Sequence, residues 1–144
     1  MNRYFIYLAY NGARYCGWQR QSNGVGVQQS IEETLSLVLR QNISVVGAGR
    51  TDAGVHARMM AAHFDVLQEL DGLSLLVDKL NGMLSKYIVI HKIIPVDKNA
   101  HARFSALART YEYMVSEKKN PFNYEYVYRT SLRKIDFDAM NEAC

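Results

Sequence analysis

One acidic residue lies in a short glycine-rich segment whose residue types could do chemistry. The segment runs from Gly47 to Ala57 and carries Asp52 two residues after Arg50. In an extended stretch, side chains two residues apart point to the same side, so a guanidinium is expected beside the carboxylate. A positive neighbour favours the ionised acid and orients it, which suits a nucleophile or a general base. On these residues alone, an ordinary turn is the favoured explanation of the pattern, and an Arg–Asp pair is also an ordinary surface ion pair.

Arginines in loop-like contexts form a second group of candidates. Arginine there suits phosphate contact and stacking, although exposed arginines are common on any protein surface. The candidate phosphate ligands are Arg14, Arg20, Arg58 and Arg103. Trp18 lies in a loop rich in Gly and Arg, and two interpretations stay open for it. It either contacts RNA or supports the candidate loop, or it is an anchor in the core.

The histidines and cysteines do not suggest a metal site. His56 lies in the glycine-rich segment, where it either contacts RNA or braces the loop. His63 falls in an apolar, strand-like run and is expected to be packed or capping, and His101 is expected to support structure. The histidines lack metal-ligand spacing, so no metal is expected. Cys16 and Cys144 suggest neither a disulfide framework nor a zinc site.

The composition is that of one globular domain. The chain has 144 residues, of which 49% are hydrophobic and 22% charged, with a net charge of +3. That net charge is too small to indicate a partner. No long apolar run predicts a membrane span, and the sequence begins in a strand-like pattern without a signal-peptide core. A reducing cytoplasm is the expected location.

Six elements in the order βαββαβ are expected to position these residues. The order matches the ferredoxin-like α+β arrangement, an antiparallel sheet with two helices on one face. The opposite face would then be free for a ligand. The strands are expected at Arg3–Tyr10, Ile43–Gly47, Ala61–Val66 and Ile88–Ile94, and the helices at Val27–Arg40 and Leu73–Leu84.

The last third of the chain is expected to add a β-hairpin and a helix. The hairpin strands are Arg109–Val115 and Tyr124–Arg129, joined around Asn120-Pro121. Asp136 is predicted to cap a helix that begins at Phe137. We expect residues 1–130 to form the ferredoxin-like subdomain that bears the aspartate loop. Residues 131–144 would begin a connection to a further half, because a helix of about two turns is marginal alone.

Several ordered blocks resemble the tRNA pseudouridine synthase A family. Their order and approximate spacing agree across essentially the whole chain, which makes the resemblance specific. The blocks are Tyr15–Gln21, Val27-Gln28 with the helix that follows, the signature Gly49–His56, His101–Ala106 and Arg109–Tyr113. One departure is Arg58-Met59-Met60, where the family commonly has a Gly-Gln pair, so any polar role of that Gln is in doubt here.

The resemblance implies that uridine is isomerised to pseudouridine in the tRNA anticodon stem-loop, around positions 38 to 40, without a metal or organic cofactor. Asp52 matches the catalytic aspartate, Arg50 the arginine that helps displace the target base, and Tyr111 the tyrosine that packs on the uracil. The fold implied is the N-terminal half of a pseudouridine synthase, and the full-length protein would be a homodimer. Because the family's second half is missing, the chain alone is expected to have little or no activity.

A non-catalytic RNA-binding module on a ferredoxin-like sheet is the alternative hypothesis. RNA-recognition domains share this architecture, and fold does not determine function. The sequence disfavours it, because no RNP-like aromatic pattern lies on a central strand and the signature centres on an acid. A phosphate-binding metabolic domain is weaker still, since the loop has no Gly-Lys-Ser/Thr ending.

Overall fold

The computed structural model describes residues 1–131 and 135–143, and the chain divides into two compact units. The first unit is Met1–Leu107 and the second is Ala108–Cys144. Among the helices of the described residues, none is long and apolar enough to cross a membrane.

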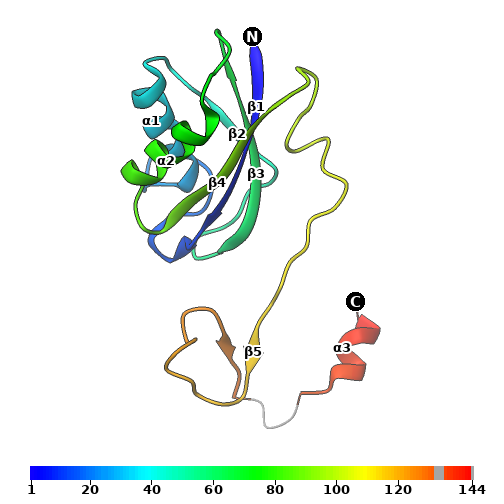
Figure 1. Ribbon diagram of the computed structural model, residues 1–144. Helices are drawn as coiled ribbons and strands as arrows, with labels where there is room; N and C mark the ends of the chain where they lie inside the picture. The colour runs from blue at the N-terminus through cyan, green and yellow to red at the C-terminus, as the bar shows by residue number, and fades with distance from the viewer. Residues whose placement is uncertain (132–134, 144) are drawn as a thin grey trace. The chain divides into compact units, whose positions relative to one another are not determined.

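The first unit is a four-stranded antiparallel sheet with two helices on one of its faces (Figure 1). The sheet order is β2-β3-β1-β4, which is the ferredoxin-like order and confirms the predicted fold class. Its elements are β1 (Asn2–Tyr10), a 3-10 turn η1 (Gly12–Arg14), α1 (Val27–Leu39), β2 (Val45–Gly47), β3 (Ala57–Val66), α2 (Leu73–Met83) and β4 (Ile88–Val96).

The core lies between the sheet and the two helices, and simple side-chain periodicity creates it. Every second residue of β1 is buried, and the stripe on α1 has helical spacing. Fully burying a large apolar side chain contributes about 1.5–3 kcal/mol, so these two patterns account for much of the stability. The buried side chains include Tyr4, Ile6, Leu8 and Tyr10 from β1, Val27, Ile31 and Leu35 from α1, and Leu76 and Leu80 from α2.

Two strands are longer than their sequence patterns indicate. β3 begins at Ala57, because its first residues continue the pairing with β1 as far as Tyr10 opposite Ala57. β4 continues through Pro95 to Val96. It is an outer strand of the sheet, where a proline leaves no ladder hydrogen bond unmade.

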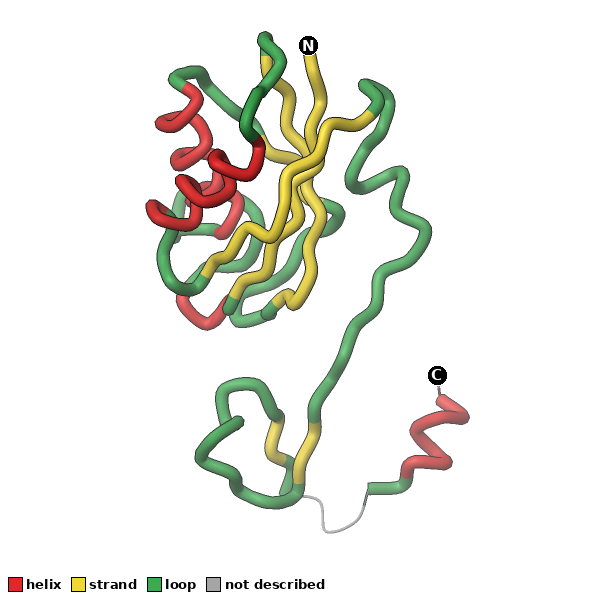
Figure 2. The backbone as a smooth tube through the Cα atoms, viewed as in Figure 1, coloured by secondary structure: helices red, strands yellow, loops and turns green. Residues whose placement is uncertain are grey.

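The sheet face opposite the helices is partly covered, so the expectation that it is free was wrong. The segment that follows β4 returns over this face (Figure 2). The backbone N–H of Ala102 donates to Nδ1 of His63 on β3 at 3.1 Å. The Arg3 guanidinium, which also pairs with Asp65, donates to the Ala100 carbonyl at 3.0 Å.

The second unit holds two short strands and a helix. β5 (Val115–Ser116) and β6 (Tyr128–Arg129) pair in parallel, so the predicted antiparallel hairpin was wrong. Most side chains between residues 109 and 129 are exposed, and without a buried face a long ladder is not stabilised. Helix α3 (Phe137–Ala143) begins where predicted, and the Asp136 carboxylate accepts a hydrogen bond from the Ala139 N–H at 3.0 Å.

Candidate active site

Asp52 lies on the exposed loop that joins β2 to β3. The chain turns there, with the Val55 N–H donating to the Asp52 carbonyl at 3.2 Å and Gly54 at φ +83°. The turn interpretation is therefore confirmed, but it does not exclude chemistry, because the Asp52 side chain is exposed. Among the described residues, no ion pair joins Arg50 to Asp52. The expected ion pair is therefore absent. The chain bends at residues 48–49 and turns again from Asp52 to Val55.

The loop is held at Thr51 from two directions. The Tyr10 hydroxyl and the Thr51 hydroxyl share a hydrogen bond of 2.8 Å, and the backbone N–H of Trp18 donates to the Thr51 carbonyl at 2.9 Å. Gly17 has a φ of +80°, and a Cβ there would lie 2.5 Å from the Thr51 carbonyl oxygen. Only glycine permits this approach, so the residue beside Asp52 is fixed through close backbone packing.

A second anchor holds the far end of the loop. The Gly12 N–H donates to Nδ1 of His56 at 3.1 Å. A Cβ on Gly12 would lie 2.0 Å from the Val55 carbonyl oxygen, so the turn η1 packs directly against the loop. His56 is half-buried in this position, which favours its interpretation as a brace.

Trp18 is a buried residue whose indole packs beside the end of β2, where the Asp52 loop begins. Its side chain is 2% exposed and lies with its ring centroid 5.9 Å from that of Tyr10. A Cβ on Gly47, the last residue of β2, would meet the indole at 2.6 Å. The indole therefore packs between the end of β1 and the end of β2. The structure favours the core-anchor interpretation of Trp18, combined with support of the loop.

Two open cavities meet at Arg50. The larger has a volume of about 560 Å³ and brings Asp52, Arg50 and Arg20 to one surface. The smaller, of about 140 Å³, brings Arg50 and Arg103 together beside Trp18. The larger cavity is lined by Cys16, Gln19, Arg20, Gln21, Asn23, Arg50, Thr51, Asp52 and Ala53.

Arg14, Arg58 and Tyr111 do not line either cavity, whereas Arg20 does. Arg14 lies over the ring of Tyr87, with its guanidinium carbon 5.9 Å from the centroid. Arg58 is exposed on β3. Tyr111 is an exposed residue of the second unit. Arg20 lines the larger cavity and also forms a 3.0 Å ion pair with Glu33.

Sequence reasoning missed the residues that fix the loop. Tyr10 reads as an ordinary buried residue of a strand, and only its position at the strand end hinted that its hydroxyl had to find a partner. Thr51 carries no signal of its own beyond its place in the family signature. Gln19 and Gln21 at the larger cavity carried no signal of their own beyond their place in a Gly- and Arg-rich loop.

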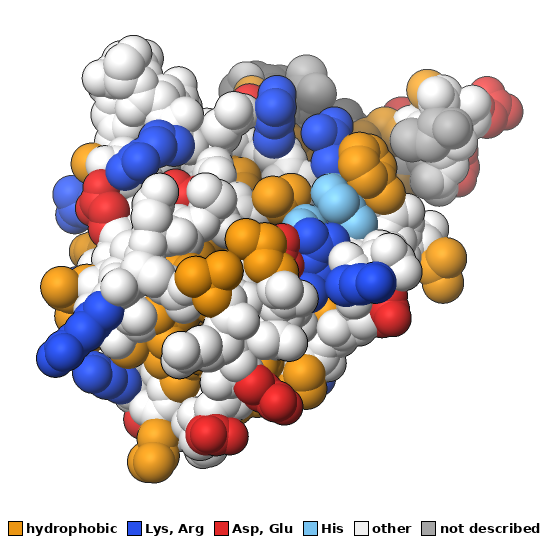
Figure 3. Space-filling model, turned by 90° about the horizontal axis from the view of Figure 1, so that it is seen from above, with side chains coloured by type: hydrophobic (Ala, Val, Ile, Leu, Met, Phe, Trp, Pro, Cys, Tyr) orange, Lys and Arg blue, Asp and Glu red, His pale blue; other side chains and the backbone are white. Residues whose placement is uncertain are grey.

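A histidine cluster lies on the covered sheet face. The His63 and His101 rings are 4.6 Å apart, and His101 stacks on Phe104 at 4.3 Å. Burial lowers the pKa of His63 to about 4, and the nearby charges of Arg3 and His101 act in the same direction. In Figure 3, histidine side chains lie among basic and apolar ones on the face in view. The cluster therefore fixes the segment that carries Arg103.

The arrangement can present a carboxylate to a ligand beside an arginine. Asp52 is exposed at an open cavity, on a loop whose neighbouring residues are fixed, which is what a nucleophile or a general base requires. Within residues 1–131 and 135–143, no three His, Cys, Asp or Glu side chains come together as metal ligands.

Comparison with known proteins finds one family. A model of the tRNA pseudouridine synthase family matches residues 6–105. The chain is similar to proteins named tRNA pseudouridine synthase A. The one from Parabacteroides distasonis is 57% identical over 144 residues, and the one from Azobacteroides pseudotrichonymphae 54% identical over 143. The match covers 100% and 99% of this chain, which spans 57% of the length of each of these relatives.

Proposed function

The chain belongs to the tRNA pseudouridine synthase family, and from this we propose that it is the aspartate-bearing N-terminal part of an enzyme that converts uridine to pseudouridine in tRNA. The observation that supports the proposal most is the position of Asp52. Its exposed carboxylate lies at an open cavity with Arg50, on a loop anchored through Thr51 and His56. A loop held by these contacts, with an accessible acid, suits chemistry on an extruded base.

The proposed reaction rearranges one nucleotide and needs no co-reactant. The bond from the ribose carbon to uracil nitrogen breaks, the base turns, and a bond forms from the same ribose carbon to a uracil carbon. That uracil carbon loses its proton and the released ring nitrogen takes one up, so the product is an isomer of the substrate. Asp52 attacks either the sugar or the base. Arg50, which borders both cavities, helps displace the target base from its stack. Tyr111 packs on the uracil as an aromatic platform.

Basic side chains of the first unit would hold the tRNA backbone. Arg20 lines the larger cavity and Arg103 the smaller one. Arg14 and Arg58 are exposed in the first unit and would add phosphate contacts further out. Trp18 and His56 act through the loop that they hold.

We place the target uridines in the anticodon stem-loop, around positions 38 to 40 of the tRNA, and the enzyme in the cytoplasm as a homodimer without metal or organic cofactor. Residues 1–130 would form the catalytic subdomain and 131–144 the start of a connection. The part of the relatives that this chain does not span would close the cavity opposite Asp52. The chain alone should then form little or no pseudouridine.

The decisive experiment replaces Asp52 in the complete protein that carries this sequence. Asp52→Asn removes the ionised carboxylate but keeps its shape, so pseudouridine formation should fall by at least about a thousandfold, as for other reacting groups. Binding of tRNA should stay within about threefold, since phosphate contacts dominate affinity. Pseudouridine mapping on tRNA from cells that lack the gene gives the readout.

Asp71→Asn is the matched control, because Asp71 is also an exposed aspartate in a loop but lies before α2. It should keep normal activity. Activity of Asp52→Asn within tenfold of the unaltered protein would remove Asp52 from the mechanism. Tight tRNA binding without modification by the unaltered protein would instead favour the non-catalytic RNA-binding module.

A further inference from the structure

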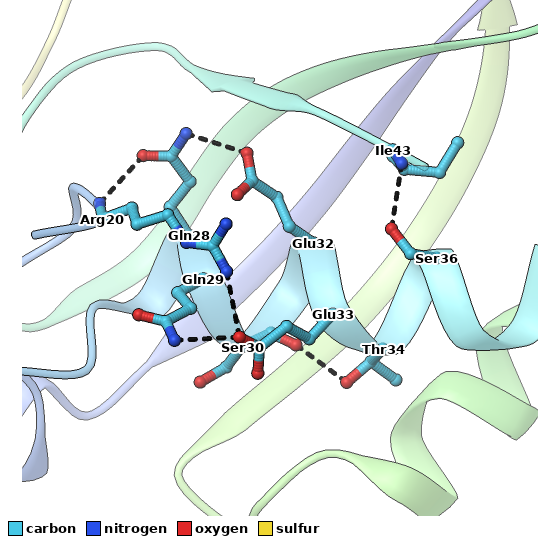
Figure 4. Close-up of polar contacts among 9 residues, drawn as sticks. All are labelled: Arg20, Gln28, Gln29, Ser30, Glu32, Glu33, Thr34, Ser36 and Ile43. Carbon is cyan, nitrogen blue, oxygen red and sulfur yellow. Dashed lines mark hydrogen bonds and ion pairs between the residues drawn. The ribbon is translucent and has the colours of Figure 1, made fainter. Parts of the chain in front are cut away.

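Gln28, the second residue of α1, uses its side chain to join three parts of the fold. Figure 4 draws its bonds to Arg20 and Glu32. Its side-chain amide oxygen accepts a hydrogen bond from the backbone N–H of Arg20 at 3.2 Å. Its amide nitrogen donates to the Val45 carbonyl at 2.9 Å and to the Glu32 carboxylate at 3.0 Å. One side chain thus connects the segment before α1, the helix itself and the first residue of β2.

Glu32 makes a second side-chain hydrogen bond from α1 to the first residue of β2, Val45. It is buried, and the same oxygen that accepts from Gln28 also accepts from the Val45 N–H at 2.9 Å. Both peptide groups of Val45, its N–H and its carbonyl, are therefore bound by side chains of α1. Buried polar groups are costly when unpaired, so an apolar pair at 28 and 32 would not replace this arrangement.

The first turn of α1 also holds the segment on the other flank of the loop. The Val27 and Gln28 N–H groups, which a helix leaves without internal partners, donate to the carbonyls of Gly17 at 3.1 Å and Trp18 at 2.9 Å. The Trp18 N–H in turn donates to the Thr51 carbonyl. A continuous set of hydrogen bonds therefore runs from the start of α1 to the residue before Asp52.

We propose that Gln28, held in place by Glu32, is a positioning residue for the Asp52 loop. It sets the spacing between the segment at Trp18–Arg20 and β2, and the loop leaves directly from β2. Gln28 also lines the smaller cavity together with Arg50. Replacing Gln28 would therefore change the surface of the cavity that Arg50 borders. The inference rests on the proposed function, because its consequence is measured as a rate of pseudouridine formation.

The helix supplies its own control, one residue further along. Gln29 donates to Glu33 at 2.8 Å, which repeats the residue types and the spacing of the Gln28–Glu32 pair (Figure 4). Glu33 is exposed, and its other bond goes to the Arg20 side chain. Within residues 1–131 and 135–143, the side chains of Gln29 and Glu33 make no bond to β2 or to a loop backbone group. The Gln29–Glu33 pair therefore stabilises helix α1 but does not set the distance between the Trp18–Arg20 segment and β2.

The test compares Gln28→Met with Gln29→Met in the complete protein, by steady-state kinetics on tRNA well below the melting temperature of each variant. Misplacement of reacting groups by about 1 Å can cost on the order of a hundredfold in rate. For Gln28→Met we expect kcat to fall by about tenfold to a hundredfold while KM stays within about threefold. For Gln29→Met both constants should stay within about twofold. Equal kcat values in the two variants would overturn the proposal.

A charge swap provides rescue and covers the case in which Gln28→Met does not fold. Gln28→Glu places two carboxylates together and should lower kcat further. Adding Glu32→Gln removes the repulsion between the two carboxylates and restores the bond between the two side chains, together with the acceptors for the backbone N–H groups of Arg20 and Val45. The Val45 carbonyl still lacks the donor that Gln28 supplied, so kcat should recover only in part, by about tenfold relative to the single variant. Equal kcat in the single and double variants would refute the positioning role. If the unaltered protein forms no pseudouridine, the proposed function itself is refuted. If the unaltered protein is active and its kcat does not change on substitution of Gln28, only this inference is refuted.

Discussion

At the scale of single residues, His63 is the group whose ionisation the fold constrains most clearly. Its Nδ1 accepts the Ala102 N–H on the covered sheet face, and it can do so only when that nitrogen carries no proton. Burial lowers its pKa to about 4, with the charges of Arg3 and His101 acting the same way and Asp65 opposing them. The neutral ring is therefore part of the folded state.

Acid should destabilise the protein through His63. Because the folded pKa is depressed below the usual value of 6.5, the unfolded chain binds more protons between these values. The contribution is fully present above about pH 6.5 and is lost as the pH falls toward 4, on the order of 3 kcal/mol. Urea unfolding at several pH values between 7.5 and 4.5 measures it.

The control for this titration is His63→Asn, whose side-chain oxygen can accept the same N–H and does not titrate. The pH dependence that separates the two proteins isolates His63 from the other histidines. Parallel stability curves for the two proteins over this range would show that His63 is not responsible. The lowered pKa of Asp65, caused first by its hydrogen bond to Arg3, acts at more acidic pH and does not confuse the comparison.

At the scale of elements, the candidate site depends on how closely β2 packs on the indole of Trp18. Gly47 allows this contact because it has no side chain. The indole is buried and also lies beside the Tyr10 ring, 5.9 Å between centroids, so it has little room to move. The contact therefore transmits the position of the β2 end to the loop that begins one residue later.

Gly47→Ala should lower the free energy of unfolding by about 1–3 kcal/mol, since its Cβ would lie 2.6 Å from a rigid buried ring. Gly82→Ala is the control. Gly82 lies in α2 with nothing within 4 Å of an added Cβ, and alanine there should stabilise by up to about 1 kcal/mol. Chemical denaturation of both variants tests the pair. A Gly47→Ala protein as stable as the unaltered one would mean that the contact is looser than described.

The elements were predictable where one local pattern determines them. The alternation from Tyr4 to Tyr10 and the stripe from Val27 to Leu35 each depend on neighbours along the chain, and both were identified correctly. The start of β3 was missed because Arg58 and Met59 are exposed and interrupt the pattern. The cover on the second sheet face was missed because it joins His63 to Ala102, 39 residues apart. Asp52 was identified through a motif. The residues that hold its loop, Tyr10, Gly12 and Trp18, lie in three other segments and belong to no single local pattern.

At the scale of the whole chain, stability is concentrated in the first unit. Among the described residues, every buried apolar side chain belongs to Met1–Leu107, and the second unit contributes only Thr130 to the buried set. A single core of this kind supports cooperative folding on its own. The second unit is expected to gain most of its stability from contacts beyond its own residues.

A fragment of residues 1–107 should therefore fold by itself. We expect one cooperative unfolding transition with a free energy within about 1 kcal/mol of that of residues 1–144. Far-UV circular dichroism in a urea series measures both proteins. A peptide of residues 108–144 serves as the comparison and should show no cooperative transition. A broad transition for 1–107, or a loss well above 2 kcal/mol, would show that the second unit contributes to the core.

The anchors described around Asp52 engage mainly peptide groups: the Thr51 carbonyl, the Asp52 carbonyl and the close approach to Val55. Shape is thus encoded in the main chain, while the identity of the exposed side chains is left open. Such a division allows the acid or its neighbour Ala53 to be exchanged without rebuilding the scaffold. The loop is consequently a site where directed evolution could try new reactive groups on an unchanged frame.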